Sequence, residues 1–166
     1  MKKITLILAL IISFKQNSIA QKVDSLTIWE EKPTIKISGF LDVFYVYDFN
    51  KPTTNYRQSF LYNHNRHNEF NLNLGLLKWE IKHPKYTANI AMQTGTYAND
   101  NYVAEPGLLK NIHEANIGIS LNKKNSLWLN TGVLPSHIGF ESAVSIDNWT
   151  LTRSLLTDNS PYYLTG

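Results

Sequence analysis

The sequence predicts an all-β protein: an antiparallel up-and-down transmembrane β-barrel, of which this chain of 166 residues holds the N-terminal five strands or so, after a cleaved signal peptide. Three observations predict this fold. Five segments alternate apolar and polar residues with the period of two that is typical of strands. The connections between them are long and short in turn, as in outer-membrane barrels. The N-terminus has the composition of an export signal.

The export signal is predicted over residues 1–20. Two lysines precede an apolar run at Ile4–Phe14, and a short polar stretch follows. The apolar run is about half the length that a membrane-spanning helix needs, which is about twenty residues. We therefore predict cleavage between Ala20 and Gln21, the alternative being an amphipathic or buried first helix. Residues 21–33 are expected to form a periplasmic N-terminal segment.

The partial barrel is predicted over residues 34–166, and its first two strands have one apolar face each. In the first strand, Thr34–Asp48, this face includes Ile35, Ile37, Leu41, Val43 and Tyr45. In the second, the apolar face is predicted to hold Phe70, Leu72, Leu74 and Leu76, with Asn71, Asn73 and Gly75 opposite. Lys78 would continue the apolar face and extend its ammonium to the lipid headgroups.

Three further strands follow the same rule. They are predicted over Tyr86–Gly95, Glu114–Leu121 and Leu127–Val133. Each sets Ile, Leu, Met or Ala against Asn, Gln, Glu, Ser or Gly. No segment has the spacing of an amphipathic helix, so no helix competes with these strands.

The lengths of the connections alternate. Residues 50–68, 98–112 and those from 135 onward are long connections, whereas 82–85 and 122–125 are short ones with Pro or Asn. Tight turns at one end of a sheet and long loops at the other are typical of transmembrane barrels, with turns on the periplasmic side.

The two faces receive different expected roles. The apolar face would meet lipid, and the polar face would line a water-filled lumen, where amides cost little. The expected lumen-lining residues are Lys36, Asp42, Glu69, Asn71, Asn73, Asn89, Gln93, Glu114, Asn116 and Asn130. The expected aromatic girdle at the two membrane interfaces consists of Tyr45, Tyr47, Phe70 and Tyr86.

Five strands do not close a barrel, because single-chain bacterial barrels have an even number of strands, eight or more. A sixth strand could start at Leu164–Gly166. We therefore expect this chain to be the N-terminal portion of a larger barrel; a folded product from a gene with a stop codon after Gly166 would refute that expectation. Whether the barrel is a monomer or a homo-oligomer is left open.

Charge and cysteine content exclude several classes of function. The formal charge is +3, but three lysines lie among the first twenty residues, and the remainder has 13 bases and 13 acids. A neutral chain has no basic surplus for nucleic acid, so none is expected as a partner. The chain has no cysteine, which excludes disulfides, thiolate metal sites and cysteine nucleophiles. It has 18 asparagines, so it is rich in uncharged polar groups.

The densest polar cluster lies at residues 63–69 and contains two histidines. His64 and His67 near Glu69 could form a metal site, but on a strand the two imidazoles would face opposite sides. We favour a loop network at the barrel mouth. No nucleophile motif or phosphate loop is present, so neither catalytic residues, nor a metal, nor a cofactor is expected.

The last connection, from Pro135, is about thirty residues long and rich in apolar residues. Such residues are not expected to stay in water. The loop is predicted either to fold into the lumen, where Asp147, Arg153 and Asp158 would set charge at a constriction, or simply to cap the mouth.

Several segments resemble a known family, the OmpL-like outer-membrane β-barrel porins of Bacteroidetes-type bacteria. The segments that carry the resemblance are Ile37–Tyr45, Asp48–Pro52, Phe60–Asn73, Gly95–Tyr97, Tyr102, Ala104–Gly107, Pro135–Ser142 and Trp149–Ser154. The resemblance implies an outer-membrane pore in contact with outer-membrane lipid that passes small solutes, without indicating which solutes.

Two other functions remain open at the level of the sequence. One is a barrel that acts as a surface receptor or adhesion scaffold through its long loops. The other is a secreted lipocalin-like binding module, which would bury the apolar face and expose the asparagine face to water.

Overall fold

The structure, a computed structural model, describes residues 29–166. The predicted signal peptide and residues 21–28 therefore lie outside the described residues. The chain divides into two units, Met1–Glu31 and Lys32–Gly166, and the second contains the whole sheet. The description that follows concerns this second unit.

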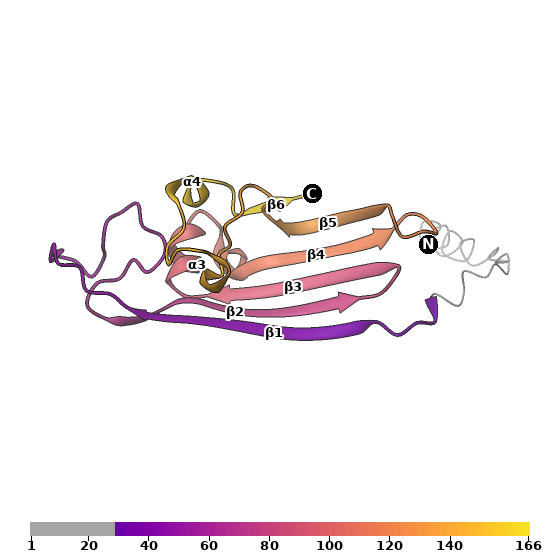
Figure 1. The fold of residues 1–166 in the computed structure, drawn as a ribbon, viewed down its shortest axis with the longest axis horizontal. Helices are drawn as coiled ribbons and strands as arrows, with labels where there is room; N and C mark the ends of the chain where they lie inside the picture. Colours follow the sequence, from indigo (N-terminus) through magenta and orange to yellow (C-terminus); the bar gives the residue numbers. More distant parts are fainter. Residues whose placement is uncertain (1–28) are drawn as a thin grey trace, which may run out of the picture. The chain divides into compact units, whose positions relative to one another are not determined.

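The second unit consists of six strands and four short helices (Figure 1). The strands are β1 (Thr34–Tyr45), β2 (Phe70–Lys82), β3 (Tyr86–Thr94), β4 (Ile112–Ser120), β5 (Trp128–Pro135) and β6 (Tyr163–Thr165). The helices are α3 (Thr96–Asn101), η1 (Gly107–Asn111), η2 (Ser145–Asp147) and α4 (Leu155–Asp158).

The sheet is antiparallel and up-and-down, because its spatial order β1-β2-β3-β4-β5-β6 follows the sequence. This confirms the predicted all-β antiparallel fold and the five predicted strands, and β6 is the expected sixth strand. Tight turns join β2 to β3 and β4 to β5, while the other connections are long. The sheet is open, since no pairing links β1 and β6 within the described residues. None of the helices in residues 29–166 is long and apolar enough to cross a membrane.

A register shift in β2 decides which side chains share a face. Asp42 pairs with Leu74 but Val43 pairs with Leu72, so Asn73 is the extra residue of a β-bulge. After the bulge the alternation changes phase. The prediction that Leu74, Leu76 and Lys78 lie on the apolar face is therefore wrong, and Gly75 lies on the apolar face instead of the polar one. The physical reason is the period of two, which moves every following side chain to the other face when one residue is inserted.

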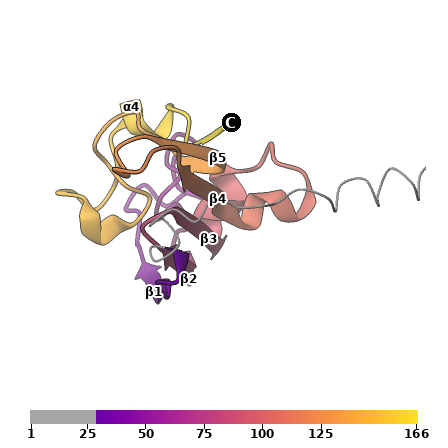
Figure 2. The same ribbon diagram turned by 90° about the vertical axis from the view of Figure 1, so that its right-hand side faces the viewer.

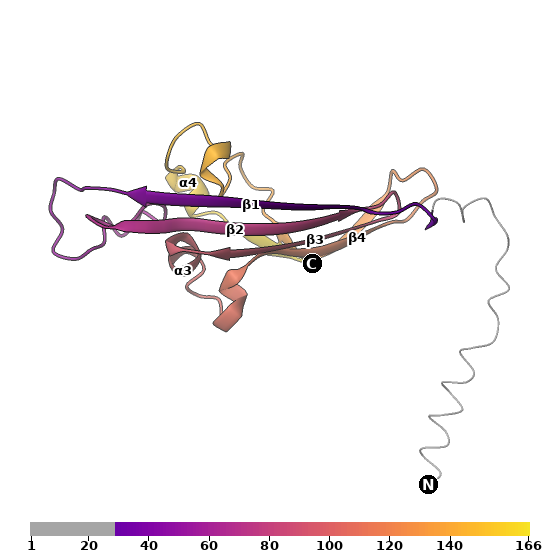
Figure 3. The same cartoon turned by 90° about the horizontal axis from the view of Figure 1, so that it is seen from below.

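The sheet curves, and the two longest loops lie on its concave side (Figures 2 and 3). These are residues 46–69, between β1 and β2, and residues 136–162, between β5 and β6. The shifted Leu74 meets them there in a small core with Tyr97 and Tyr102, each at most 1% exposed. Phe40, Leu76, Ala143, Val144, Tyr162 and Tyr163 pack around these three residues. The loop end of the concave face is thus covered by protein.

The convex face has the opposite character. Ile35, Ile37, Leu41 and Val43 on β1 are between 64% and 75% exposed. Ile90, Ile117 and Leu129 on β3, β4 and β5 are between 44% and 56% exposed. A secreted binding module would bury this face, so the arrangement favours the membrane interpretation.

Candidate functional site

The concave face of the sheet is the candidate site, and it has two halves. The turn-end half carries Lys36, Lys78, Glu80, Asn89 and Asn116. The loop-end half carries Phe40, Asp42, Leu74 and Leu76 together with the two loops that cover them.

Ion pairs link strands β1, β2 and β4 across the turn-end half. Lys78 Nζ lies 2.7 Å from Glu114 Oε2 and 3.9 Å from Glu80 Oε1. Glu80 Oε2 lies 3.7 Å from Lys36 Nζ. Lys78 can reach β4 because its neighbour on β3 is Ala91, whose small side chain leaves the path clear. The charges of this half therefore compensate one another along the sheet.

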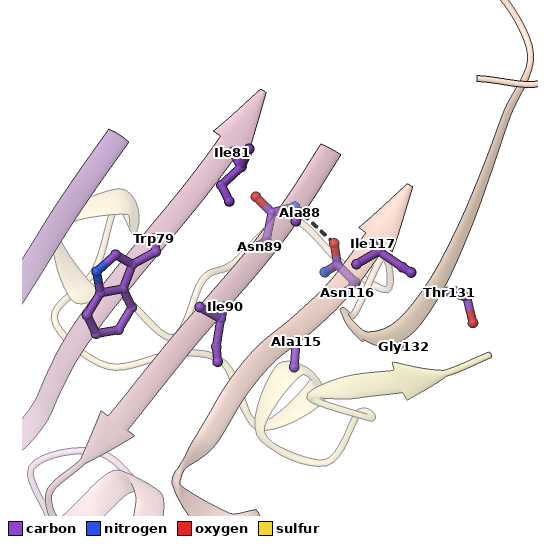
Figure 4. A pocket seen from close by; sticks show the side chains of 10 residues that line it. All are labelled: Trp79, Ile81, Ala88, Asn89, Ile90, Ala115, Asn116, Ile117, Thr131 and Gly132. Carbon is purple, nitrogen blue, oxygen red and sulfur yellow. Dashed lines mark hydrogen bonds between the residues drawn. The ribbon is translucent and has the colours of Figure 1, made fainter. Parts of the chain in front are cut away.

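An amide ladder continues this row toward β5. Asn89 Nδ2 donates to Asn116 Oδ1 at 2.9 Å, as Figure 4 shows. Asn116 Nδ2 in turn donates to Glu114 Oε1 at 2.9 Å. Asn130 is on the same face, because a Cβ added at Gly118 would lie 2.3 Å from its side-chain oxygen. Asn89, Asn116 and Asn130 thus form one continuous polar row across β3, β4 and β5. Gln93, the other expected lumen residue of β3, is 3% exposed and donates from its side-chain nitrogen to the Lys110 carbonyl at 3.0 Å.

Asp42 is the centre of the loop-end half. Its Oδ2 atom accepts hydrogen bonds from Asn73 Nδ2 at 2.9 Å and Ser145 Oγ at 3.0 Å, and lies 3.0 Å from His64 Nε2. These three partners belong to β2, to the loop 136–162 and to the loop 46–69. One carboxylate oxygen therefore joins both long loops to the sheet.

The two histidines of the polar cluster at residues 63–69 bind different partners. His64 is 2% exposed and binds Asp42, and its φ of 50° lies in the left-handed region. His67 Nδ1 accepts a hydrogen bond from the backbone N–H of Asp48 at 2.9 Å, and its ring packs on Tyr47. Within residues 29–166, no group of three or more His, Cys, Asp or Glu side chains is placed to hold a metal ion.

Glu69 closes the base of the loop 46–69. It accepts hydrogen bonds from Arg66 Nε at 2.5 Å and from Asn55 and Asn71 side chains, each at 2.9 Å. These donors, Arg66 first, lower the pKa of Glu69 from its usual 4.5 to about 2. Glu69 and Asn71 are therefore engaged by the loop, in contrast to the lumen residues of β3 and β4.

The three expected constriction residues separate into a pair and a single residue. Arg153 Nη2 lies 2.6 Å from Asp158 Oδ1, and both side chains are at most 6% exposed. The Arg153 guanidinium also lies 4.8 Å above the ring of Tyr97 and donates to its hydroxyl at 3.1 Å. Burial raises the pKa of Asp158 against the opposing effect of Arg153. Asp147 is exposed and takes no part in this ion pair, but it lines a hollow of about 490 Å³ together with Arg153.

A cavity of about 300 Å³ lies beside this ion pair. It is lined by Tyr97, by His113 and by residues around Glu141 in the loop 136–162. Glu141 accepts hydrogen bonds from Ser154 and Thr157, which lower its pKa. The charged groups around the cavity are thus already paired within the protein.

The expected girdle residues make aromatic contacts near the ends of the strands. The rings of Tyr45 and Phe70 pack at 5.1 Å on the convex face, and those of Tyr47 and Phe49 at 5.4 Å in the adjoining loop. Tyr86 stacks on His83 at 4.3 Å beside the first tight turn. Their role as an interface girdle stays a prediction.

A hollow of about 490 Å³ lies among β2 to β5 and is lined largely by apolar side chains of the convex face (Figure 4). The hollow exists because the side chains of Ala88 and Ala115 are small. The larger side chains of Trp79, Ile90 and Ile117 surround it. Its lining offers few polar groups, so it suits an apolar chain and is not the candidate site.

The structure also shows what the sequence reasoning missed. Glu80 belongs to the ion pairs of the turn-end half, and Ser145 and Tyr97 hold the loops. One signal was present for β2: Lys78 and Glu80 alternate with Leu77, Trp79 and Ile81, out of phase with Phe70 and Leu72. Two alternations of opposite phase in one strand indicate a bulge. No comparable signal identified Ser145 or Tyr97.

Comparison with known proteins gives one family. Residues 34–166 match the family described as "Putative beta-barrel porin-2, OmpL-like". No curated protein and no solved structure shows a significant match to the chain. The matched range begins at the first residue of β1 and includes every strand.

Proposed function

This chain belongs to the OmpL-like beta-barrel porin-2 family, and on that premise we propose that its sheet lines a water-filled outer-membrane pore for the passive diffusion of small solutes. The observation that carries the proposal is the contrast between the two faces of the strands. The convex face is apolar and exposed, and the concave face holds a continuous row of charged and amide side chains. A lumen needs the second kind of surface and a bilayer the first.

The turn-end half of the concave face is the solute-contacting surface in this proposal. Lys36 there is 67% exposed at its side chain, so water and solutes reach its ammonium. The loop-end half, whose polar groups are engaged by the two long loops, narrows the entrance. The protein acts without chemistry: it requires no catalytic residue and no cofactor.

The experiment uses the full-length protein purified from the outer-membrane fraction. We expect a band that shifts in apparent mass on boiling, as closed barrels do, and stepwise conductance in planar lipid bilayers. A heat-shifted barrel without conductance would contradict the pore and favour a receptor or adhesion scaffold. An unshifted, detergent-free soluble protein would contradict the barrel itself.

Variants in which the charge of one lysine is reversed then test whether the concave face lines the pore. Lys36→Glu is expected to shift the reversal potential in a salt gradient toward cation preference, because a charge beside the permeation path changes the local ion concentration. Lys124→Glu, in the exposed turn between β4 and β5, is the matched control. Equal shifts in the two variants would contradict the assignment of the concave face to the lumen.

A further inference from the structure

We propose that the connection between β3 and β4 is a lipid anchor, which inserts apolar side chains into the outer leaflet beside the barrel wall. The inference goes beyond the proposed function and rests on it for the orientation of the sheet. The segment in question, the anchor segment, comprises residues 102–111 and includes η1.

The anchor segment starts in the core, where the Tyr102 ring lies 4.2 Å from that of Tyr162, and its η1 part then lies on the side of the sheet opposite to the other long loops. Figures 2 and 3 place η1 on the convex side, away from α4 and the loop 136–162. The Gly107 φ of 53° begins the turn that forms η1. The segment therefore projects toward the surface that faces lipid in a porin.

The side chains of the anchor segment are sorted by polarity. Tyr102 is fully buried in the core, and the Glu105 carboxylate accepts a hydrogen bond from the Tyr163 hydroxyl. By contrast, Val103, Leu108 and Leu109 are 72%, 83% and 55% exposed. The polar group is thus held by the protein, and the apolar groups are left outside it.

Membrane lipid is the partner that suits the exposed apolar side chains of the anchor segment, because these side chains continue the apolar convex face. Met92 at the end of β3 is 47% exposed and pairs with Ile112, the first residue after η1. Because the convex face of the strands contacts lipid in the proposed barrel, the same acyl chains extend to Leu108 and Leu109. Lys110, the single base of the segment, suits the anionic headgroups above them.

The long loops end on the outer side in the expected topology, which places the anchor segment at the outer leaflet. Apolar side chains at that depth resist vertical displacement of the wall, in the manner of an interfacial amphipathic helix.

The test uses single-cysteine variants of the full-length protein, which is practical because the 166 residues contain no cysteine. Leu108→Cys carries a fluorescent label in phospholipid vesicles whose acyl chains are brominated near the headgroup. Leu156→Cys is the matched control, since Leu156 is also a leucine, is 79% exposed and lies on α4 at the opposite side. Leu41→Cys, on the convex face of β1, is the control for lipid contact of the barrel.

We expect strong quenching at positions 41 and 108 and little at position 156. Quenching at 41 without quenching at 108 would overturn the anchor and leave the barrel intact. Disulfide formation between copies of the Leu108→Cys variant, without quenching, would also overturn it and assign the patch to a second copy of the chain. Absence of quenching at 41 would overturn the proposed barrel, and the anchor with it.

Discussion

The two halves of the concave face satisfy their polar groups in different ways. In the turn-end half, side chains of neighbouring strands pair with one another, as Lys78 does with Glu114. In the loop-end half, the loops supply the partners, as His64 and Ser145 do for Asp42. In the first arrangement the Lys36 side chain remains 67% exposed although Glu114 is 6% exposed, whereas in the second the loops cover Asp42, whose side chain is 12% exposed. Polar residues on one face thus pair across neighbouring strands in one half and fix the long loops in the other.

The largest expected difference between the halves concerns the core under the loops. Tyr102→Ala removes a fully buried ring that contacts Tyr97, Tyr162 and Tyr163. We expect a loss of about 3 to 5 kcal/mol in the free energy of unfolding, the usual cost of deleting a buried aromatic side chain. Urea unfolding in detergent, followed by tryptophan fluorescence, measures it.

Phe140→Ala is the control for that variant, because Phe140 is also an aromatic residue of a long connection, in the loop 136–162, but is 96% exposed. Its effect should stay within about 0.5 kcal/mol, as for other exposed positions. Similar losses in the two variants would show that the loops are not fixed by the core.

The next effect concerns Asp42. Asp42→Ala leaves His64, Asn73 and Ser145 without their common acceptor, and removing one partner from a buried polar network costs about 3 kcal/mol. Amide hydrogen exchange should increase in both 46–69 and 136–162, since the carboxylate joins them.

Glu80→Gln makes the corresponding change in the turn-end half. We expect a loss below about 1 kcal/mol, because its partner Lys36 is largely exposed. Exchange in the two long loops should not change. If Asp42→Ala affected only one loop, Asp42 would not be the junction between them.

A smaller effect is expected for the ion pair between Arg153 and Asp158. A double-mutant cycle with Arg153→Met and Asp158→Asn should give a coupling energy of about 1 to 3 kcal/mol, because the two buried groups lie in contact. A cycle with Lys36→Met and Glu80→Gln in the turn-end half should give less than about 1 kcal/mol. A larger coupling in the turn-end half would reverse the comparison.

The smallest effect depends on pH and concerns Glu69. Its pKa is lowered to about 2 in the folded protein, so its contribution to loop stability is present above the usual value of 4.5 and is lost as the pH falls toward 2. Hydrogen exchange across 50–68 should therefore increase over this range and lose that dependence in Glu69→Gln. Glu141→Gln, which affects the other long loop, is the control. A pH dependence that persists in Glu69→Gln would assign the effect to another group.

The bulge at Asn73 shows where reasoning from the sequence stopped. Alternation located all five predicted strands, because strand side chains have a fixed period of two. The same rule, applied as one unbroken alternation, assigned Leu74, Leu76 and Lys78 to the wrong face; the change of phase within β2 indicates a bulge, and the pairing with β1 places the extra residue at Asn73. A local pattern specifies the strand, and the partner strand specifies the register.

In the candidate site, too, alternation along the strands predicted some features and could not predict others. Asn89, Glu114 and Asn116 were placed on one face by alternation alone, and the structure brings them into one row. The joining of Asp42 to Ser145 could not be predicted in this way, since 103 positions separate them in the chain.

The sequence by itself determined the fold class, the strand order and the segregation of long loops from tight turns, because these depend on periodicity and turn residues that act over a few positions. Only the tertiary structure decided which half of the concave face is covered and that the anchor segment turns outward. These features depend on contacts between distant segments, whose geometry no local pattern encodes.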